Sequence, residues 1–457
     1  MKTVPKRLLV VGGLFGVGAA FSPGSLFVLL LVAATVAALR RFIPSGDRVF
    51  LIRLFLAAFF VRAILSLGLD LGSRFVEGTF PVKNGPVEYW NLGILDRTRG
   101  YLRMGDSDYY SERGYSLAQY ASGVREPAIL RRIQDYGHNG YVLIIGWFYY
   151  LFGFSPISVK LLNGWIGALH VLPIFFLAKS CFQPTIARWT AVGVAGFPTL
   201  VFWSTANLKE PLMFLLTAVL FLLFRFFQIA HTLSRRALLG GLFLLTFYLL
   251  SDLSRREFFL VLVACLMLAF SVEQCFRKRW FAALILGAVA LIYFGFPVIR
   301  EGLHLAVYRH RGYVGEPGIT YRYLPEKFYL PGFSMPTEAI VRAIPNAVMH
   351  YLLEPNLLWA GSRFALFLVP QMIPWYFLLP LALIGVAAGL RRKPWNCGFL
   401  AMILFFWILM GALSNANIGT LIRLRDMVTP IVLLFAAAGF WTFARGSTGL
   451  SQGASTL

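Results

Sequence analysis

The chain has 457 residues, of which 58% are hydrophobic and only 14% are charged. This composition excludes an ordinary soluble domain, because the apolar residues form long runs of the kind that cross a bilayer as α-helices. The 42 Lys and Arg residues exceed the 20 Asp and Glu residues by 22. Much of this positive charge lies at the ends of apolar runs, which is typical of membrane topology, and we therefore expect no nucleic-acid partner.

Twelve apolar runs are predicted to cross the membrane. In chain order they are 8–21, 26–39, 50–69, 161–178, 190–205, 212–229, 237–250, 258–271, 281–298, 375–390, 399–413 and 428–443. The first two runs are interpreted as a membrane hairpin and not as a cleaved leader, because the second follows at once. The apolar run 141–154 does not fit the alternation, so we expect it to be a re-entrant or surface helix.

The predicted fold is an all-α polytopic membrane protein of about twelve transmembrane helices in the cytoplasmic (inner) membrane. Basic residues after alternate runs place both termini in the cytoplasm. We divide the chain into an N-terminal hairpin, a transmembrane core with an extracytoplasmic loop at 70–140, a second extracytoplasmic loop region, and C-terminal transmembrane helices with a short cytoplasmic tail. Both extracytoplasmic loops are expected to carry short surface helices. The four segments are 1–48, 49–300, 301–374 and 375–457.

Two acids stand close together in the first long loop, in the stretch R-M-G-D-S-D-Y-Y at 103–110. Asp106 or Ser107 is suited to cap the helix that the following residues predict. Alternatively, a carboxylate on the outer membrane face can take a proton from an acceptor hydroxyl. A second carboxylate can help to hold a divalent cation against a phosphate. The residues alone leave both interpretations of Asp106 and Asp108 open.

The stretch F-W-S-T-A-N-L-K-E-P at 202–211 places charge between two apolar runs. Its simplest interpretation is an outward turn in which Pro211 opens the next helix. Ionisable groups at this depth are costly and usually face a polar cavity. The functional interpretation, which we favour, makes Glu210 a metal ligand or an acid–base partner and Lys209 a phosphate contact.

Two arginine pairs lie in outward turns, where positive charge is disfavoured. Arg255 and Arg256 follow the run 237–250, and Arg423 and Arg425 precede the last run. Contact with the membrane surface would account for either pair. The alternative is an anionic head group, because a guanidinium matches phosphate oxygens with paired hydrogen bonds.

Taken in order, these stretches resemble the GT-C membrane glycosyltransferases, which include protein O-mannosyltransferases and lipid A aminoarabinose transferases. The resemblance rests on G-D-S-D-Y-Y, then Y-V-L-I-I-G-W-F-Y-Y-L-F-G-F-S-P, K-L-L-N-G-W-I-G-A-L-H-V-L-P-I-F-F-L-A-K, P-T-L-V-F-W-S-T-A-N-L-K-E-P and a late R-L-R-D-M-V-T-P. It is strongest over 106–227. This chain departs from the usual layout in its extra hairpin at 8–39 and in Lys209-Glu210, which stands where many members carry an Asp.

The resemblance implies an inverting transferase that passes a sugar from a polyprenyl-phosphate donor to a glycan, lipid or protein acceptor on the extracytoplasmic face. By position, Asp106 would be the general base and Asp108 a helper, and Glu210 would match the second acidic site. Asp108 and Glu210 are the candidate ligands of a divalent cation, Mg²⁺ or Mn²⁺. The candidate donor-phosphate ligands are Lys209, Arg255, Arg256, Arg423 and Arg425.

Two other functions remain open at this point. An O-antigen or exopolysaccharide polymerase or ligase, which uses lipid-diphosphate-linked glycans, also presents arginines on outward loops. A flippase or transporter of lipid-linked glycans is disfavoured because no broken-helix inverted repeat is evident. The chain has no G-x-x-x-x-G-K-[ST] motif, and its six His and four Cys are not clustered. We therefore expect membrane lipids as partners, and neither a nucleotide nor haem as cofactor.

Overall fold

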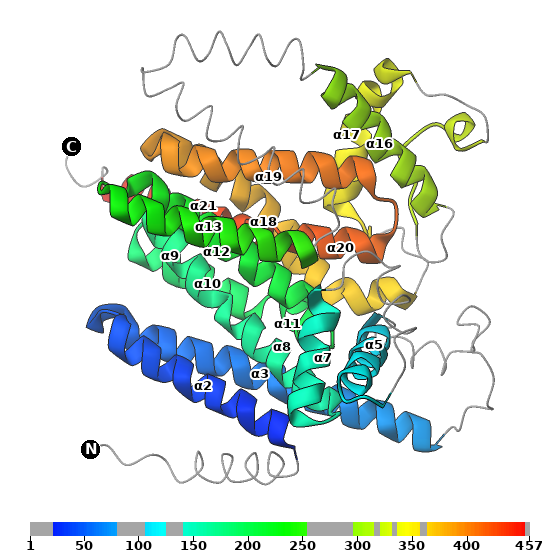
Figure 1. The fold of residues 1–457 in the computed structure, drawn as a ribbon. Helices are drawn as coiled ribbons and strands as arrows, with labels where there is room; N and C mark the ends of the chain where they lie inside the picture. The colour runs from blue at the N-terminus through cyan, green and yellow to red at the C-terminus, as the bar shows by residue number, and fades with distance from the viewer. Residues whose placement is uncertain are drawn as a thin grey trace. The chain divides into compact units, whose positions relative to one another are not determined.

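A computed structural model of the chain describes residues 22–79, 106–124, 140–253, 296–314, 320–330, 336–356 and 363–452. These residues are almost entirely helical, and the structure assigns no β-strand within them. Their isolated antiparallel bridge joins Thr320 and Asn417. The all-α prediction is therefore confirmed for these residues (Figure 1). Helices suit apolar segments, because a helix satisfies its backbone amides within the segment itself.

Seven helices in the described ranges are long and apolar enough to cross a membrane, and the bent pair α20–α21 would make an eighth. The seven are α2 (Pro23–Phe42), α3 (Ser45–Thr79), α8 (Pro156–Leu169) continued by α9 (Val171–Cys181), α12 (Glu210–Ile229), α13 (Leu233–Leu253), α18 (Arg363–Arg392) and α19 (Pro394–Ser414). The bent pair is α20 (Ile418–Asp426) and α21 (Thr429–Gln452), which meet at 61°. The predicted runs 8–21 and 258–271, and nearly all of 281–298, lie outside the described residues.

The prediction of one spanning helix over 190–205 is wrong. This run forms the end of α10 (Pro184–Gly196) and the short α11 (Pro198–Trp203). Phe197 between them has an extended backbone, with φ −64° and ψ 124°. Pro198 causes the break, since it has no N–H to continue the first helix and restricts the residue before it.

Helices also occupy much of the two regions that were predicted as long connections. The helix α3 continues past Asp70 to Thr79, and Asp70 pairs with Lys160 of α8 at 2.7 Å. The first region further contains α5 (Asp106–Ala121), and α7 (Gly140–Phe152) begins where this region ends. The second contains α16 (Phe296–Val314), the 3₁₀ turn η2 (Glu326–Tyr329), α17 (Thr337–Leu353) and the start of α18.

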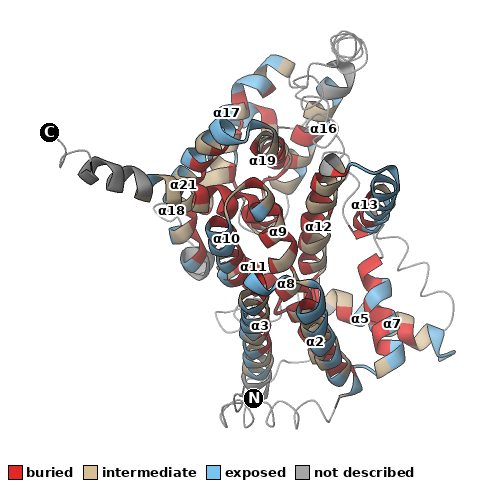
Figure 2. Cartoon of the chain, turned by 90° about the vertical axis from the view of Figure 1, so that its left-hand side faces the viewer, coloured by how far each residue is buried: buried red, intermediate tan, exposed pale blue. Residues whose placement is uncertain are grey.

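The chain folds as two compact units, each built from segments distant in sequence. The first comprises Met1–Ile174 and Val194–Arg255, and the second Phe175–Gly193 and Arg256–Leu457. In the first unit α8 is largely buried and contacts α2, α3 and α12, whereas α2 presents most of its surface outward (Figure 2). In the second unit α18 packs along α21, and α19 packs against α16 and α17.

The helices α5 and α7 lie side by side in both views of the first unit (Figures 1 and 2). Their contact depends on glycine, because a Cβ on Gly114 would overlap the Ile145 side chain. A Cβ on Gly146 would lie 2.5 Å from Leu117 Cδ2. The 13-residue α7 is also too short to cross the hydrocarbon core, in agreement with the interpretation of 141–154 as a non-spanning helix.

Candidate active site

The start of α5 meets the connection between α11 and α12 in the first unit. The backbone N–H of Asn207 donates to Ser107 Oγ at 3.0 Å. The Asn207 amide nitrogen donates to Ser111 Oγ on the same face of α5, and it reaches Tyr149 Oη of α7 at 3.3 Å. Asn207 is fully buried. One residue therefore joins α5, α7 and the segment that carries Lys209 and Glu210.

A second buried asparagine holds the same connection from α8. The side-chain amide of Asn163 donates to the carbonyl oxygens of Ala206 and Leu208 at 2.7 and 2.8 Å. It also lies 2.7 Å from Tyr141 Oη of α7. Buried amides are stabilising when their partners are in place, and each lost partner leaves a buried polar group unsatisfied. Asn163 thus fixes the backbone on both sides of Asn207.

Glu210 is the first residue of α12 and is 7% exposed. The helix start favours a carboxylate there, because the unsatisfied N–H groups of the first turn carry partial positive charge. Lys209 precedes it, and its Nζ donates to the carbonyl oxygen of Leu253 at the end of α13, at 2.9 Å. The two charges therefore have different roles, since Lys209 ties α12 to α13 while Glu210 is enclosed.

Two tyrosine rings, Tyr110 of α5 and Tyr141, pack together at the start of α7. The rings of Tyr110 and Tyr141 meet edge to face with centroids 5.2 Å apart. Burial raises the pKa of the Tyr141 hydroxyl; the hydrogen bond with Asn163 opposes this shift, and the nearby Glu210 carboxylate raises the pKa further. Tyr141 therefore stays protonated beside Glu210 at neutral pH.

Asp106 is the first residue of α5, as the sequence predicts for a helix start. The side chains of Asp106 and Asp108 lie outside the described part of the structure, so their roles stay predictions. Ser107 lies within the first turn, and its hydroxyl accepts from Asn207 on another segment. Ser107 is therefore not the cap of its own helix.

The predicted arginines Arg423 and Arg425 lie on α20 of the second unit. Arg425 is 0% exposed, and its Nη1 donates to the carbonyl oxygen of Glu354 at 3.0 Å. Its guanidinium also stacks over the Trp375 ring at 4.6 Å. Arg423 is only half-buried. The geometry makes Arg425 an internal tie between α20 and the end of α17. Arg255 and Arg256 lie outside the described residues.

A histidine that the sequence did not single out anchors the turn before α20. His310 of α16 is fully buried, with Nδ1 2.9 Å from the carbonyl oxygen of Asn415 and Nε2 2.7 Å from Tyr329 Oη. A carbonyl can only accept, so Nδ1 carries the proton and the Tyr329 hydroxyl donates to Nε2. Burial lowers the pKa of His310 to about 4, the bond to Asn415 opposes this, and nearby His350 lowers it further.

Arg62 of α3 was also missed, although a lone arginine in the run F-F-V-R-A-I-L is a recognisable signal. It is 1% exposed, and its Nε donates to Ser204 Oγ at 2.9 Å. Its Nη1 donates to the carbonyl oxygen of Ala195 in the last turn of α10, at 2.9 Å. The break at Pro198 leaves carbonyls without helical partners, and Arg62 supplies one.

A metal site was predicted at Asp108 and Glu210. Within the described ranges, no three His, Cys, Asp or Glu side chains group closely enough to hold a metal ion. Of the two predicted ligands, the structure places the side chain of Glu210 alone. The metal assignment stays a prediction.

No protein-family model matches the chain, and no curated protein sequence does. Among solved structures, the chain is similar to the crystal structure of ArnT from Cupriavidus metallidurans bound to undecaprenyl phosphate. The TM-score is 0.48 at 11% sequence identity. The similarity covers 85% of this chain and 59% of that chain, so this chain spans less than two thirds of that structure.

Proposed function

We propose that this protein is an integral-membrane, inverting glycosyltransferase of the GT-C type. Its donor is a polyprenyl-phosphate-linked sugar, and its acceptor is a glycan, lipid or protein on the extracytoplasmic face. The observation that carries the proposal is the bond between Ser107 and Asn207. It brings the start of α5, where Asp106 lies, to the segment that carries Glu210, and these are the two acidic positions of the family resemblance.

The proposed reaction needs a base and a means to stabilise the leaving group. An acceptor hydroxyl attacks the anomeric carbon from the face opposite the phosphate, and the bond between that carbon and the phosphate oxygen breaks. The hydroxyl proton passes to Asp106, with Asp108 as helper. Polyprenyl phosphate leaves with increased negative charge, which nearby cations stabilise.

The proposed phosphate ligands are Lys209, Arg255, Arg256 and Arg423. Arg425 is fully buried and donates to the Glu354 carbonyl oxygen, so we assign it to holding α20.

A divalent cation, Mg²⁺ or Mn²⁺, would be held by Asp108 and Glu210. When bound it would neutralise phosphate charge on the donor. The proposed roles of Asp106 and Arg423 do not depend on it, so titration of the purified protein with EDTA and then Mn²⁺ tests the metal separately.

The donor class is tested with the full chain in lipid nanodiscs. A polyprenyl-monophosphate sugar, a polyprenyl-diphosphate glycan and a fluorescent lipid-linked glycan are supplied in parallel. The proposal predicts glycosylated acceptor from the monophosphate donor alone. Product from the diphosphate glycan alone would indicate the polymerase or ligase. Transbilayer movement of the fluorescent lipid without a new glycosidic bond would indicate the flippase.

A further inference from the structure

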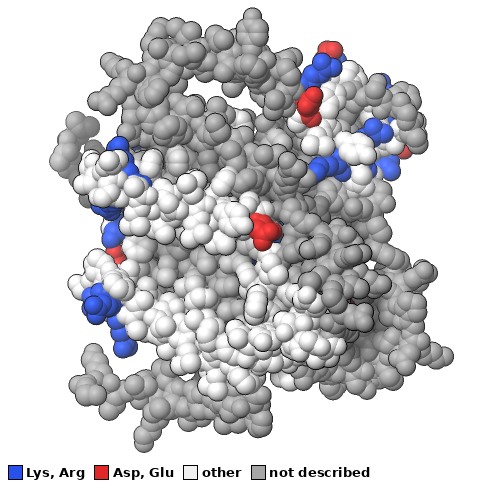
Figure 3. Space-filling view, in the orientation of Figure 1, with Lys and Arg blue, Asp and Glu red and all other residues white. Residues whose placement is uncertain are grey.

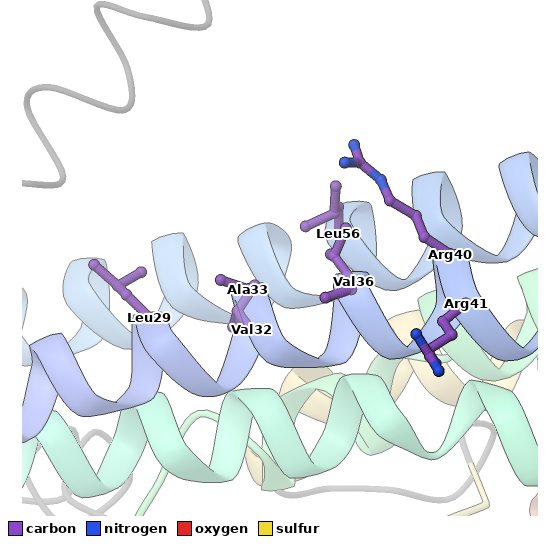
Figure 4. A pocket seen from close by; sticks show the side chains of 8 residues that line it. Leu29, Val32, Ala33, Val36, Arg40, Arg41 and Leu56 are labelled. Carbon is purple, nitrogen blue, oxygen red and sulfur yellow. The ribbon is translucent and has the colours of Figure 1, made fainter.

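A groove with a volume of about 630 Å³ runs between α2 and α3 of the first unit. This volume is in the range of ligand-binding pockets. Its lining residues are Leu29, Val32, Ala33, Val36, Ala37, Arg40, Arg41 and Leu56. Figure 4 shows Leu29, Val32 and Val36 following one another along α2 toward Arg40, with Leu56 of α3 beside Val36. The groove is therefore apolar along its length and cationic at one end.

The apolar wall faces away from the protein. Only 22% of the apolar window of α2 is buried inside the structure. Val32 is 7% exposed and forms the floor, whereas Ala33 and Ala37 are exposed. Because α2 is long and apolar enough to cross a membrane, this wall would meet the acyl chains of one leaflet.

The cationic end consists of Arg40 and Arg41 in the last turn of α2. Both are exposed, and neither forms an ion pair with any carboxylate that the structure describes. Arg48 adds a third positive charge, with its Nε donating to the Ile43 carbonyl oxygen at 3.0 Å. Figure 3 shows Lys and Arg side chains gathered over this turn. Guanidinium groups of this kind bind phosphate with paired hydrogen bonds.

The length of the groove fits one leaflet. From Arg41 back to Leu29 the helix rises about 18 Å at ~1.5 Å per residue. One leaflet contributes about 15 Å of the hydrocarbon core. We propose that this groove binds an anionic phospholipid, with an acyl chain along α2 and the phosphate at Arg40 and Arg41. The site lies at the end of α2 that was predicted to be cytoplasmic, and it is independent of the proposed sugar transfer.

Native mass spectrometry of the delipidated full chain tests the site with phosphatidylglycerol and phosphatidylcholine of identical acyl chains. The wild type should retain phosphatidylglycerol preferentially. The double variant Arg40→Gln/Arg41→Gln should bind it about tenfold more weakly, because charge-assisted hydrogen bonds are lost. The matched control is Arg391→Gln/Arg392→Gln, a second exposed arginine pair in the last turn of a spanning helix, which should bind like the wild type.

A second variant tests the apolar wall with the arginines intact. Ala33→Trp/Ala37→Trp fills the groove with bulk at exposed positions and should also weaken phosphatidylglycerol binding about tenfold. Equal binding of phosphatidylcholine, wild-type binding by both groove variants, or equal loss in the Arg391/Arg392 control would overturn the proposal. Preferential displacement of phosphatidylglycerol by a polyprenyl phosphate would assign the groove to the carrier lipid. A dimer that the groove variants dissociate would assign it to a second copy of the chain.

Discussion

The connection into α12 in the first unit and the connection into α20 in the second both pass through asparagines, but they are held differently. At α20, Asn417 Oδ1 accepts from the backbone N–H of Gly419 at 2.9 Å and of Thr420 at 3.3 Å. That is a local N-cap. At α12 no side chain caps the helix. The backbone N–H and the side-chain amide of Asn207 donate to residues of α5 and α7 instead.

The two kinds of hydrogen bond therefore have different consequences, one for the stability of a single helix and the other for the position of the candidate site. A local cap stabilises its own helix whatever the rest of the protein does. The start of α12, and with it Glu210, depends on hydrogen bonds to Asn163 of α8 and Ser107 of α5. Changes on these distant helices should therefore move the candidate site, whereas loss of the cap on α20 should cost only a small free energy.

The largest expected effect comes from Asn163→Leu. The variant leaves the carbonyls of Ala206 and Leu208 and the Tyr141 hydroxyl without a buried partner, at a cost of about 4 kcal/mol in the free energy of unfolding. Denaturant unfolding of the full chain in detergent measures it. The control Asn346→Leu removes one exposed amide that donates to Tyr323, and it should change stability by less than about 1 kcal/mol. Equal costs would remove the distinction between the two positions.

The second effect is expected at the turn before α20, which His310 holds. His310 has a folded pKa of about 4, below the value of 6.5 expected when unfolded. Its contribution to stability is complete above pH 6.5 and is lost as the pH falls toward 4, because only the unfolded state takes up the proton. The loss amounts to about 3 kcal/mol. Thermal unfolding between pH 4 and 7.5 should show it.

The variant His310→Gln should flatten this pH dependence. Other groups around the ring could contribute, and they are Tyr321, Tyr323, Tyr329, His350 and Glu354. His350→Gln separates the paired His350–Glu354 contribution from that of His310. An unchanged pH profile in His310→Gln would contradict the assignment.

An intermediate effect is expected for Ser107→Ala. It removes the hydroxyl that accepts a hydrogen bond from the backbone N–H of Asn207, at a cost of about 1–2 kcal/mol in the free energy of unfolding. Sugar transfer should fall even under conditions in which the variant stays folded. Ser122→Ala, directly after the end of α5, is the control, since the hydrogen bond described for its hydroxyl is to the Ala118 carbonyl one turn back. Equal losses of transfer in the two variants would show that the Ser107–Asn207 bond does not position the site.

The smallest effect is expected for Asn417→Ala, which removes the cap of α20 and should cost about 1 kcal/mol. Asn417→Asp keeps an accepting oxygen and should remain close to the wild type. Chemical denaturation of both variants checks the difference. A cost as large as that of Asn163→Leu would mean that the two turns are held in the same way.

Residue type and local pattern account for much of what the sequence predicted. Long apolar runs identified the candidate spanning helices, and Pro211 correctly marked the start of α12, which begins one residue earlier at Glu210. Within the run 190–205, Pro198 is a local signal for a helix break. The prediction of one helix followed the apolar character of the run and did not use this signal.

The remaining features depend on partners far away in the chain. The sequence predicts Arg425 to be an outward-facing cation. In the structure it is buried and lies against the carbonyl oxygens of Leu352 and Glu354. Asn163 and His310 likewise gain their roles from segments that no local pattern connects to them. Such long-range hydrogen bonds satisfy buried backbone groups at helix ends, and only the folded chain shows which ends meet.

We propose Asp106, at the start of α5, as the base of the sugar transfer. Turnover of purified Asp106→Asn with a polyprenyl-phosphate sugar tests it most directly, beside Glu112→Gln as an exposed acid on the same helix. We predict that Asp106→Asn folds and inserts normally but loses transfer by about 100-fold or more, while Glu112→Gln keeps it. Wild-type turnover in Asp106→Asn would show that Asp106 is not the base.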